Sequence, residues 1–196
     1  MGLGGSGLQT TMRLRRLIVE RYGSLDKFPI VRFVQINTDS GALDNANLGG
    51  KTFHRGVDIS LKESEKVHIG MTAEDANKLR NALKKSQGNT PYDFIGEWLP
   101  DYVIDNARAI DKGAGGIRAV GRLCFFLNYA AIQRAITGAE ISTQGTHPHL
   151  MQEFGLIQDE GLDIFIVGSL YGGTGSGTFL DVAYSVRKLY PNAKVH

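Results

Sequence analysis

The chain has 196 residues, 42% of them hydrophobic, and a formal net charge of +2 at pH 7. A chain of this size can bury one core, so we expect a single domain, and the nearly balanced charge gives no reason to expect specific nucleic-acid binding. No apolar run reaches the roughly 20 residues of a membrane-spanning helix, and no leader pattern is seen. We therefore expect a cytoplasmic protein without membrane association. The single cysteine, Cys124, lies in an apolar helical pattern that predicts a core position.

Glycine is unusually frequent, at 25 residues, and twelve of these lie in three short segments. We call residues 2–7, 113–121 and 172–177 the first, second and third glycine segments. Each one precedes a helical pattern, which indicates local demands on the backbone rather than general flexibility. Free backbone N–H groups at the start of a helix suit an anion such as phosphate.

The first glycine segment leads into a predicted helix over residues 8–22. Its Gly2, Gly4 and Gly7 also satisfy the dinucleotide-binding pattern G-x-G-x-x-G, which is a weak signal when it stands alone. Four arginines of the predicted helix are interpreted as a solvated face. These are Arg13, Arg15, Arg16 and Arg21.

An apolar strand is predicted over residues 30–36, and it ends on Asn37-Thr38-Asp39. Polar residues at the carboxyl end of a strand are where α/β sheets place ligand contacts. Residues 45–70 give no clear pattern. Gly50-Lys51-Thr52 does not complete a P-loop, because the required first glycine is replaced by Asn45.

The second half of the chain alternates helical and strand patterns. Thr72 and Asp75 predict the start of a helix over residues 73–85. His147 and His149 flank Pro148 without acids or cysteines at ligand spacing, so we interpret them as loop residues and not as a metal site. The other predicted elements are a short helix around 92–103, a largely buried helix over 120–136, a strand at 164–167 buried on both faces, and a helix over 179–189.

These elements predict an α/β fold, a three-layer sandwich with a mostly parallel sheet that contains residues 30–36 and 163–168. The three glycine segments and residues 37–39 should then meet at the carboxyl edge of that sheet. We expect Gly5, Gly115 and Gly175 to border one pocket. Gly175→Val should block phosphate binding while leaving the fold largely intact.

At this point the residues resemble the tubulin/FtsZ GTPases. GGTGSG at 172–177 matches the signature G-G-G-T-G-[ST]-G, with Tyr171 in place of its first glycine, and INTDSGAL at 36–43 is similar to the bacterial I-N-T-D-x-x-x-L. GAGGIRAVGR at 113–122 is similar to G-A-G-G-N-P-E-V-G-R, and GLGGSGLQT occupies the place of the first nucleotide loop. The four motifs keep the family's order over nearly the whole chain. The chain looks closest to the divergent bacterial tubulin-like proteins.

The resemblance implies a Rossmann-like domain that binds GTP or GDP with Mg²⁺. Asp39 would act on the magnesium ion through water, and Asn37 would hold its strand end. Arg118 could stabilise charge on the γ-phosphate or point to solvent, and both alternatives stay open. The α- and β-phosphates would be wrapped by Gly172, Gly173, Thr174, Gly175, Ser176 and Gly177, with hydroxyl donors from Thr174 and Ser176. They would be closed from the other side by Gly4, Gly5, Ser6 and Gly7, with Gln9 near the base or the phosphates. The γ-phosphate would be sensed by Gly113, Ala114, Gly115 and Gly116.

The resemblance also implies a filament-forming GTPase that self-associates head to tail in its full-length form. The family's base-stacking and water-activating segments would follow this stretch, so residues 1–196 are expected to form a GTP-binding domain incomplete at both ends. Alone, it should not hydrolyse GTP. Two alternatives remain. One is a dinucleotide-binding domain with Asp39 as the ribose acid, although Asp39 follows Gly7 by 32 residues rather than about 20. The other is a non-hydrolysing scaffold.

Overall fold

The computed structural model describes residues 1–45, 52–85, 92–105, 108–145, 147–157 and 161–196. A four-stranded parallel sheet lies at its centre, in the order β5-β2-β1-β7. Its strands are β1 (Gly2–Leu3), β2 (Gln35–Asn37), β5 (Lys66–His68) and β7 (Val167–Gly168). Register pairs Gly2 with both Gln35 and Val167. The carboxyl ends of these strands therefore lie along one edge.

A second parallel pair, β6 (Asp163–Ile164) with β8 (Lys194–Val195), continues this sheet. The N–H of Ile166 donates to the carbonyl of His196, and the N–H of Val167 donates to the carbonyl of Met1, both at 2.9 Å. Strands β6 and β7 thus form one extended segment, which is bonded to β8 at its start and to β1 at its end.

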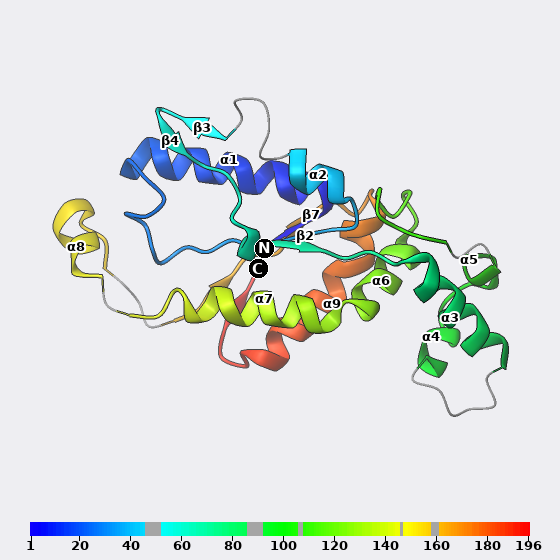
Figure 1. The fold of residues 1–196 in the computed structure, drawn as a ribbon. Coiled ribbons are helices and arrows are strands. Elements are labelled where there is room, and N and C mark those ends of the chain that lie inside the picture. The colour runs from blue at the N-terminus through cyan, green and yellow to red at the C-terminus, as the bar shows by residue number, and fades with distance from the viewer. Residues whose placement is uncertain (46–51, 86–91, 106–107, 146, 158–160) are drawn as a thin grey trace.

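Helices cover both faces of the sheet. Helix α1 (Gly4–Tyr22) lies above the strands in Figure 1, whereas α7 (Tyr129–Ile141) and α9 (Gly173–Leu189) lie below them, beside α6 (Arg118–Leu127). The main core lies between the sheet and the lower helices, and it includes the buried Cys124, as predicted. Burial raises the pKa of the Cys124 thiol to about 12. The fold is therefore the predicted three-layer α/β sandwich with a parallel sheet.

Smaller elements extend these layers. Beside α1 are α2 (Ser40–Asn45) and an antiparallel hairpin of β3 (Phe53–His54) and β4 (Val57–Asp58), and the 3-10 turn η1 (Glu63–Glu65) precedes β5. Helices α3 (Ala73–Lys85), α4 (Asp93–Gly96) and α5 (Asp101–Asp105) share a second core with α6. Helix α8 (Pro148–Phe154) lies at the opposite end of the molecule from α3–α5. No described helix has the length and apolar character needed to cross a membrane.

The predicted start of α3 is confirmed in detail. The backbone N–H of Asp75 donates to the Thr72 hydroxyl at 3.1 Å, and the Thr72 hydroxyl donates to the Asp75 carboxylate at 2.6 Å. The N–H of Thr72 reaches the same carboxylate at 3.2 Å. The hydrogen bond from the Thr72 side chain, and to a smaller extent the one from the Thr72 backbone, lowers the pKa of Asp75 below its ordinary value. The N–H of Asp75, in the first turn of α3, is therefore capped by a side chain.

Several predicted boundaries are wrong. Helices α1 and α9 begin inside their glycine segments, at Gly4 and Gly173, because a residue without a Cβ can take the φ of 65° found at Gly4 and the close backbone contact found at Gly173. The strand predicted over 30–36 is paired only over Gln35–Asn37. The helix predicted over 120–136 is split at Asn128, whose Nδ2 donates to the carbonyls of Gly70 and Cys124. The helix predicted around 92–103 is likewise two short helices, α4 and α5, with Pro100 between them.

Two predictions about burial are also wrong. The segment 163–168 is not buried on both faces: Ile164 and Ile166 pack on the core, whereas Phe165 is 58% exposed on the opposite face. The arginines of α1 are not all solvated, because Arg15 is only 2% exposed. Its Nη1 donates to both carboxylate oxygens of Glu65, at 2.9 and 3.0 Å, and its Nε donates to the carbonyl of Ile59 at 2.8 Å.

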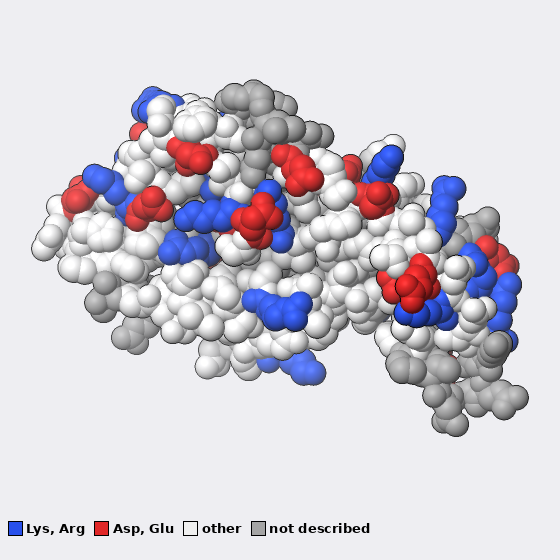
Figure 2. Space-filling view, viewed as in Figure 1, with Lys and Arg blue, Asp and Glu red and all other residues white. Residues whose placement is uncertain are grey.

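The structure also describes regions that the sequence left open. Residues 52–70 carry β3, β4, η1 and β5, whereas Gly50 and Lys51 lie outside the described residues. His149 lies within α8 rather than in a loop, and it contacts the carbonyl of Lys27 at 3.1 Å. Among the described residues there is no group of three His, Cys, Asp or Glu that could hold a metal ion. In Figure 2, basic and acidic side chains are interspersed over the visible face.

Candidate functional site

The third glycine segment lies beside the first. A Cβ placed on Gly4 would be 3.2 Å from the Cβ of Thr174 and 3.5 Å from the backbone N of Gly175. This proximity follows from the topology, because β1 and β7 are neighbouring parallel strands and each is followed by the start of a helix. The two helices therefore begin next to each other at the carboxyl edge of the sheet.

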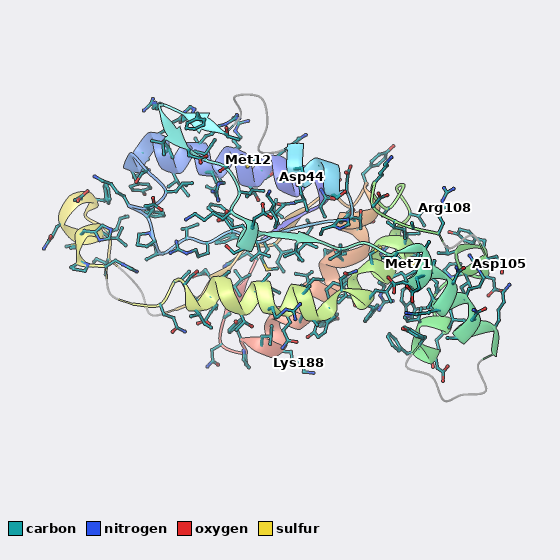
Figure 3. All side chains as sticks on the ribbon, in the orientation of Figure 1. Met12, Asp44, Met71, Asp105, Arg108 and Lys188 are labelled. Atoms are coloured by element: carbon teal, nitrogen blue, oxygen red, sulfur yellow. The ribbon has the colours of Figure 1, made fainter. Side chains whose placement is uncertain are left out.

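The second glycine segment reaches the same place from the other side. A Cβ on Gly173 would lie 2.8 Å from the N of Ile117 and 2.9 Å from the Cβ of Ala114. The N–H of Gly113 donates to the carbonyl of Thr38 at 3.1 Å, which connects this segment to the end of β2. In Figure 3 this edge of the sheet lies between Asp44, on α2, and Arg108.

The end of β2 completes the cluster. The hydroxyl oxygens of Thr38 and Thr174 are 2.6 Å apart, and the N–H of Ser40 donates to the carbonyl of Asp111 at 2.9 Å. Three glycine segments and residues 37–39, which are far apart in the sequence, thus share one edge. The structure brings together the regions that the sequence analysis singled out.

Three helices begin at this edge without a side-chain cap. Their N-cap residues are Leu3 for α1, Ile117 for α6 and Gly172 for α9, and none of the three makes a side-chain capping hydrogen bond. Helix α3, away from this edge, is closed by Thr72 and Asp75. Uncapped N–H groups carry the positive end of the helix dipole, so their convergence suits an anion with several oxygens.

The glycines at this edge fall into two groups. At Gly5, Gly115, Gly116 and Gly172, no atom of the described residues lies within 4 Å of the point where a Cβ would stand. At Gly175 a Cβ would instead meet the carbonyl oxygen of Ser169. We therefore no longer expect Gly175→Val to leave the loop undisturbed, since its side chain would strike backbone before it met a ligand.

Asn37 and Asp39 lie at the carboxyl end of β2, on this edge of the sheet. Asn37 is only 3% exposed, and its Oδ1 accepts the N–H of Asp39 at 3.2 Å. Its Nδ2 is buried, with no hydrogen-bond partner in the described part of the chain. A buried donor without an acceptor costs about 1–3 kcal/mol, so an oxygen-rich ligand fits this position.

The carboxylate of Asp39 is half-buried, and one of its oxygens accepts the N–H of Ala42 at 2.9 Å. A single carboxylate cannot form a complete protein cage for a metal ion, and no group of three possible ligands is found among the described residues. It does suit Mg²⁺, which keeps most of its waters and is commonly held by one or two carboxylates together with phosphate oxygens. The residues present therefore fit a nucleotide accompanied by Mg²⁺.

Other candidate residues make contacts away from the cluster at this edge or are exposed to solvent. The guanidinium of Arg118 lies over the ring of Phe179, 5.9 Å from its centroid, and so packs along α9. The Ser176 hydroxyl donates to the carbonyl of Gly172 at 2.6 Å, which commits its hydrogen within the helix. Gln9 is exposed on α1, and Tyr171, which stands where the resembling signature has glycine, is 97% exposed.

A groove of about 440 Å³ lies elsewhere, between α9 and β8. Its walls are mostly apolar and include Leu180, Tyr184 and Val195, and of the third glycine segment only Gly175 contributes. Apolar walls do not suit phosphates, so this groove is not where the candidate site lies.

Sequence reasoning missed the part played by Thr38. It is fully buried between two residues that were singled out, and it contacts both the second and the third glycine segments. A hydroxyl residue inside the Asn-Thr-Asp stretch was the only available signal. Its contacts depend on residues 75 and 136 positions further along the chain.

The comparison with known families agrees with this arrangement. The family model described as "Tubulin like" matches residues 1–196, which is the whole of the given chain. No curated protein matches the chain by sequence. Because the match covers every glycine segment and the end of β2, the chain belongs to the tubulin-like family.

Proposed function

We propose that this chain is the GTP-binding domain of a bacterial tubulin-like, filament-forming GTPase, and that it takes GTP or GDP with Mg²⁺. One observation carries the proposal. Three uncapped helix starts meet at one edge of a parallel sheet, beside the Nδ2 of Asn37, which has no partner among the described residues. Members of the tubulin-like family generally bind GTP, and this edge offers the donors that a polyphosphate needs.

The residues take their roles from their positions. The starts of α1 and α9 would hold the α- and β-phosphates between them, and the second segment would contact the γ-phosphate. Asp39 would bind Mg²⁺ through water. The proposed contacts are those of Gly4, Gly5, Ser6, Gly7, Gln9, Asn37, Gly113, Ala114, Gly115, Gly116, Arg118, Gly172, Gly173, Thr174, Gly175, Ser176 and Gly177.

Hydrolysis is proposed for the assembled full-length protein. Uncapped N–H groups can stabilise phosphate charge, but they do not orient an attacking water, and orientation supplies several kcal/mol of barrier lowering. Head-to-tail contact between subunits, as the family resemblance implies, would complete each site. Turnover per molecule should then rise with protein concentration, as measured by phosphate release from the full-length protein in the cytoplasmic range of Mg²⁺.

A dinucleotide-binding domain is the competing proposal. The structure favours it in one respect, because Gly2 and Gly7 both pack tightly where β1 passes into α1, as the G-x-G-x-x-G pattern requires. The dinucleotide-binding proposal, however, gives no role to the second and third glycine segments, which lie at the same edge. A scaffold that binds nucleotide without turnover is the other alternative, and it predicts binding with no phosphate release.

A nucleotide panel tests these proposals directly. Calorimetric titration of the full-length protein with GTP, GDP, ATP and NAD, each with Mg²⁺, should show binding of GTP and GDP. Binding of NAD alone, or of none of these, would overturn the proposal.

The role of Asp39 is tested with a matched pair of variants. Asp39→Asn keeps an oxygen for the N–H of Ala42 but removes the charge, so the gain in GTP affinity on adding Mg²⁺ should largely disappear. Asp44→Asn removes an exposed charge from α2, the short helix that begins directly after Asp39, and should leave that gain unchanged. Equal effects from the two variants would show that Asp39 does not serve the metal ion.

A further inference from the structure

Thr38 connects two of the glycine segments through its own polar groups. Its hydroxyl oxygen is 2.6 Å from that of Thr174 at the start of α9, and its carbonyl accepts the N–H of Gly113 at 3.1 Å. The side chain is fully buried, at 0% exposure, so neither bond competes with solvent. A change at one segment can thus reach the other through a single residue.

The hydrogens of the two hydroxyls can be counted. A pair of hydroxyls joined by one hydrogen bond uses one hydrogen, and the second hydrogen must find another acceptor. In the described part of the chain neither hydroxyl has a further partner. If Thr174 donated to Thr38, the hydroxyl hydrogen of Thr38 would be buried and unpaired, because Thr38 is enclosed. This arrangement would cost about 1–3 kcal/mol.

Thr174 is in a different position. It is the second residue of α9, it is 8% exposed, and it contacts Gly4 in the first glycine segment. If Thr38 donates to Thr174, the hydrogen of Thr174 is left at the edge where the helix starts converge. This assignment leaves no buried hydrogen unpaired once an anionic oxygen is bound there.

We propose that Thr38 is a positioning residue of the nucleotide site: it donates to the Thr174 hydroxyl and so fixes that hydroxyl as a donor to a phosphate oxygen. The proposal rests on the proposed function. It adds that the Thr174 side chain acts only while Thr38 orients it, and that the same residue ties the second segment to the third through Gly113.

The test removes the Thr38 hydroxyl at nearly constant volume. In the full-length protein, Thr38→Val should weaken GDP and GTP binding about ten-fold by calorimetry, and Thr38→Ser should restore it to within about three-fold. Thr38→Ala removes the same hydroxyl without the added methyl group, and it serves if the valine variant folds poorly. The matched control is Thr178→Val, another fully buried threonine, whose hydroxyl bonds within α9 to the carbonyl of Thr174 at 2.8 Å.

A double-mutant cycle separates positioning from general stability. If Thr38 acts through Thr174, the variant with both Thr38→Val and Thr174→Val should bind no more weakly than Thr174→Val alone. Additive losses, or wild-type affinity in Thr38→Val and Thr38→Ala, would overturn the positioning role and leave the proposed function standing. A wild-type protein that binds neither nucleotide would overturn both.

Discussion

Two groups of glycines in this molecule are required for different reasons. Where α6 crosses α9, a Cβ on Gly121 would meet the carbonyl oxygen of Gly173, and a Cβ on Gly177 would meet the carbonyl oxygen of Arg118. At the rim of the candidate site, no atom of the part of the chain that the structure describes lies within 4 Å of the corresponding point at Gly5 or Gly115. The crossing needs glycine because the backbones touch, whereas the rim leaves open the space that a ligand would need.

The glycines at the rim differ in backbone conformation. Gly113, Gly115 and Gly116 have φ values of 98°, 60° and 73°, which side chains rarely adopt. Gly5 lies in the first turn of α1 with ordinary helical geometry. The same residue type therefore serves close packing at the crossing, an unusual turn in the second segment, and open space at Gly5, and substitutions can separate these three demands.

The largest effect is expected at the crossing. Gly121→Ala places a methyl group against backbone atoms that cannot rotate away, so the free energy of unfolding should fall by about 1–3 kcal/mol or more. Urea denaturation measures the change. Gly138→Ala, in α7 with open space around it, is the control, and it should be neutral or slightly stabilising. Equal stability of the two variants would contradict the close contact of α6 and α9.

An effect on binding alone is expected at Gly5. Gly5→Ala improves helix propensity and meets no protein atom, so the free energy of unfolding should stay the same or rise by up to about 1 kcal/mol. The added methyl group would occupy space that the phosphates need, and GTP affinity should fall about ten-fold by calorimetry. Gly138→Ala again provides the control for both measurements. Unchanged affinity in Gly5→Ala would mean that the open space at α1 is not used by the ligand.

A loss of stability smaller than that at the crossing is expected at Gly115. Gly115→Ala must hold a φ near 60°, which costs about 1–2 kcal/mol of unfolding free energy, although its methyl group meets no neighbour. Gly115→Asn should lose less, because asparagine tolerates this conformation. Thermal unfolding of the two variants would measure the difference. If both lost the same amount, crowding rather than backbone conformation would explain the glycine.

Much of the site could be predicted from local sequence. The glycine segments, Asn37 and Asp39 were singled out because each lies between a strand pattern and a helix pattern, and parallel strands bring such junctions to one edge. The start of α3 was equally predictable, since Thr72 and Asp75 lie three residues apart and form their bonds within one turn. Interactions between residues a few positions apart can be predicted from the spacing of those residues in the sequence.

The rest depends on segments that meet only in the folded chain. Arg15 shares its helix with three other arginines, and what buries it is Glu65, 50 residues away in the sequence. The break at Asn128 likewise depends on the carbonyl of Gly70. The exposure of Phe165 depends on which elements cover that part of the sheet.

The sequence by itself determined where the glycine-rich strand-to-helix junctions would lie, because hydrophobic periodicity and glycine spacing are local properties of the chain. It did not determine which glycines are needed for packing and which leave space for a ligand. That distinction came from the tertiary structure, where the approach of α6 to α9 closes the space beside Gly121 and Gly177, whereas the described residues leave the rim at Gly5 and Gly115 open. Every glycine looks the same in a sequence, and only its neighbours in the folded chain show whether it is needed for close packing or leaves space for a ligand.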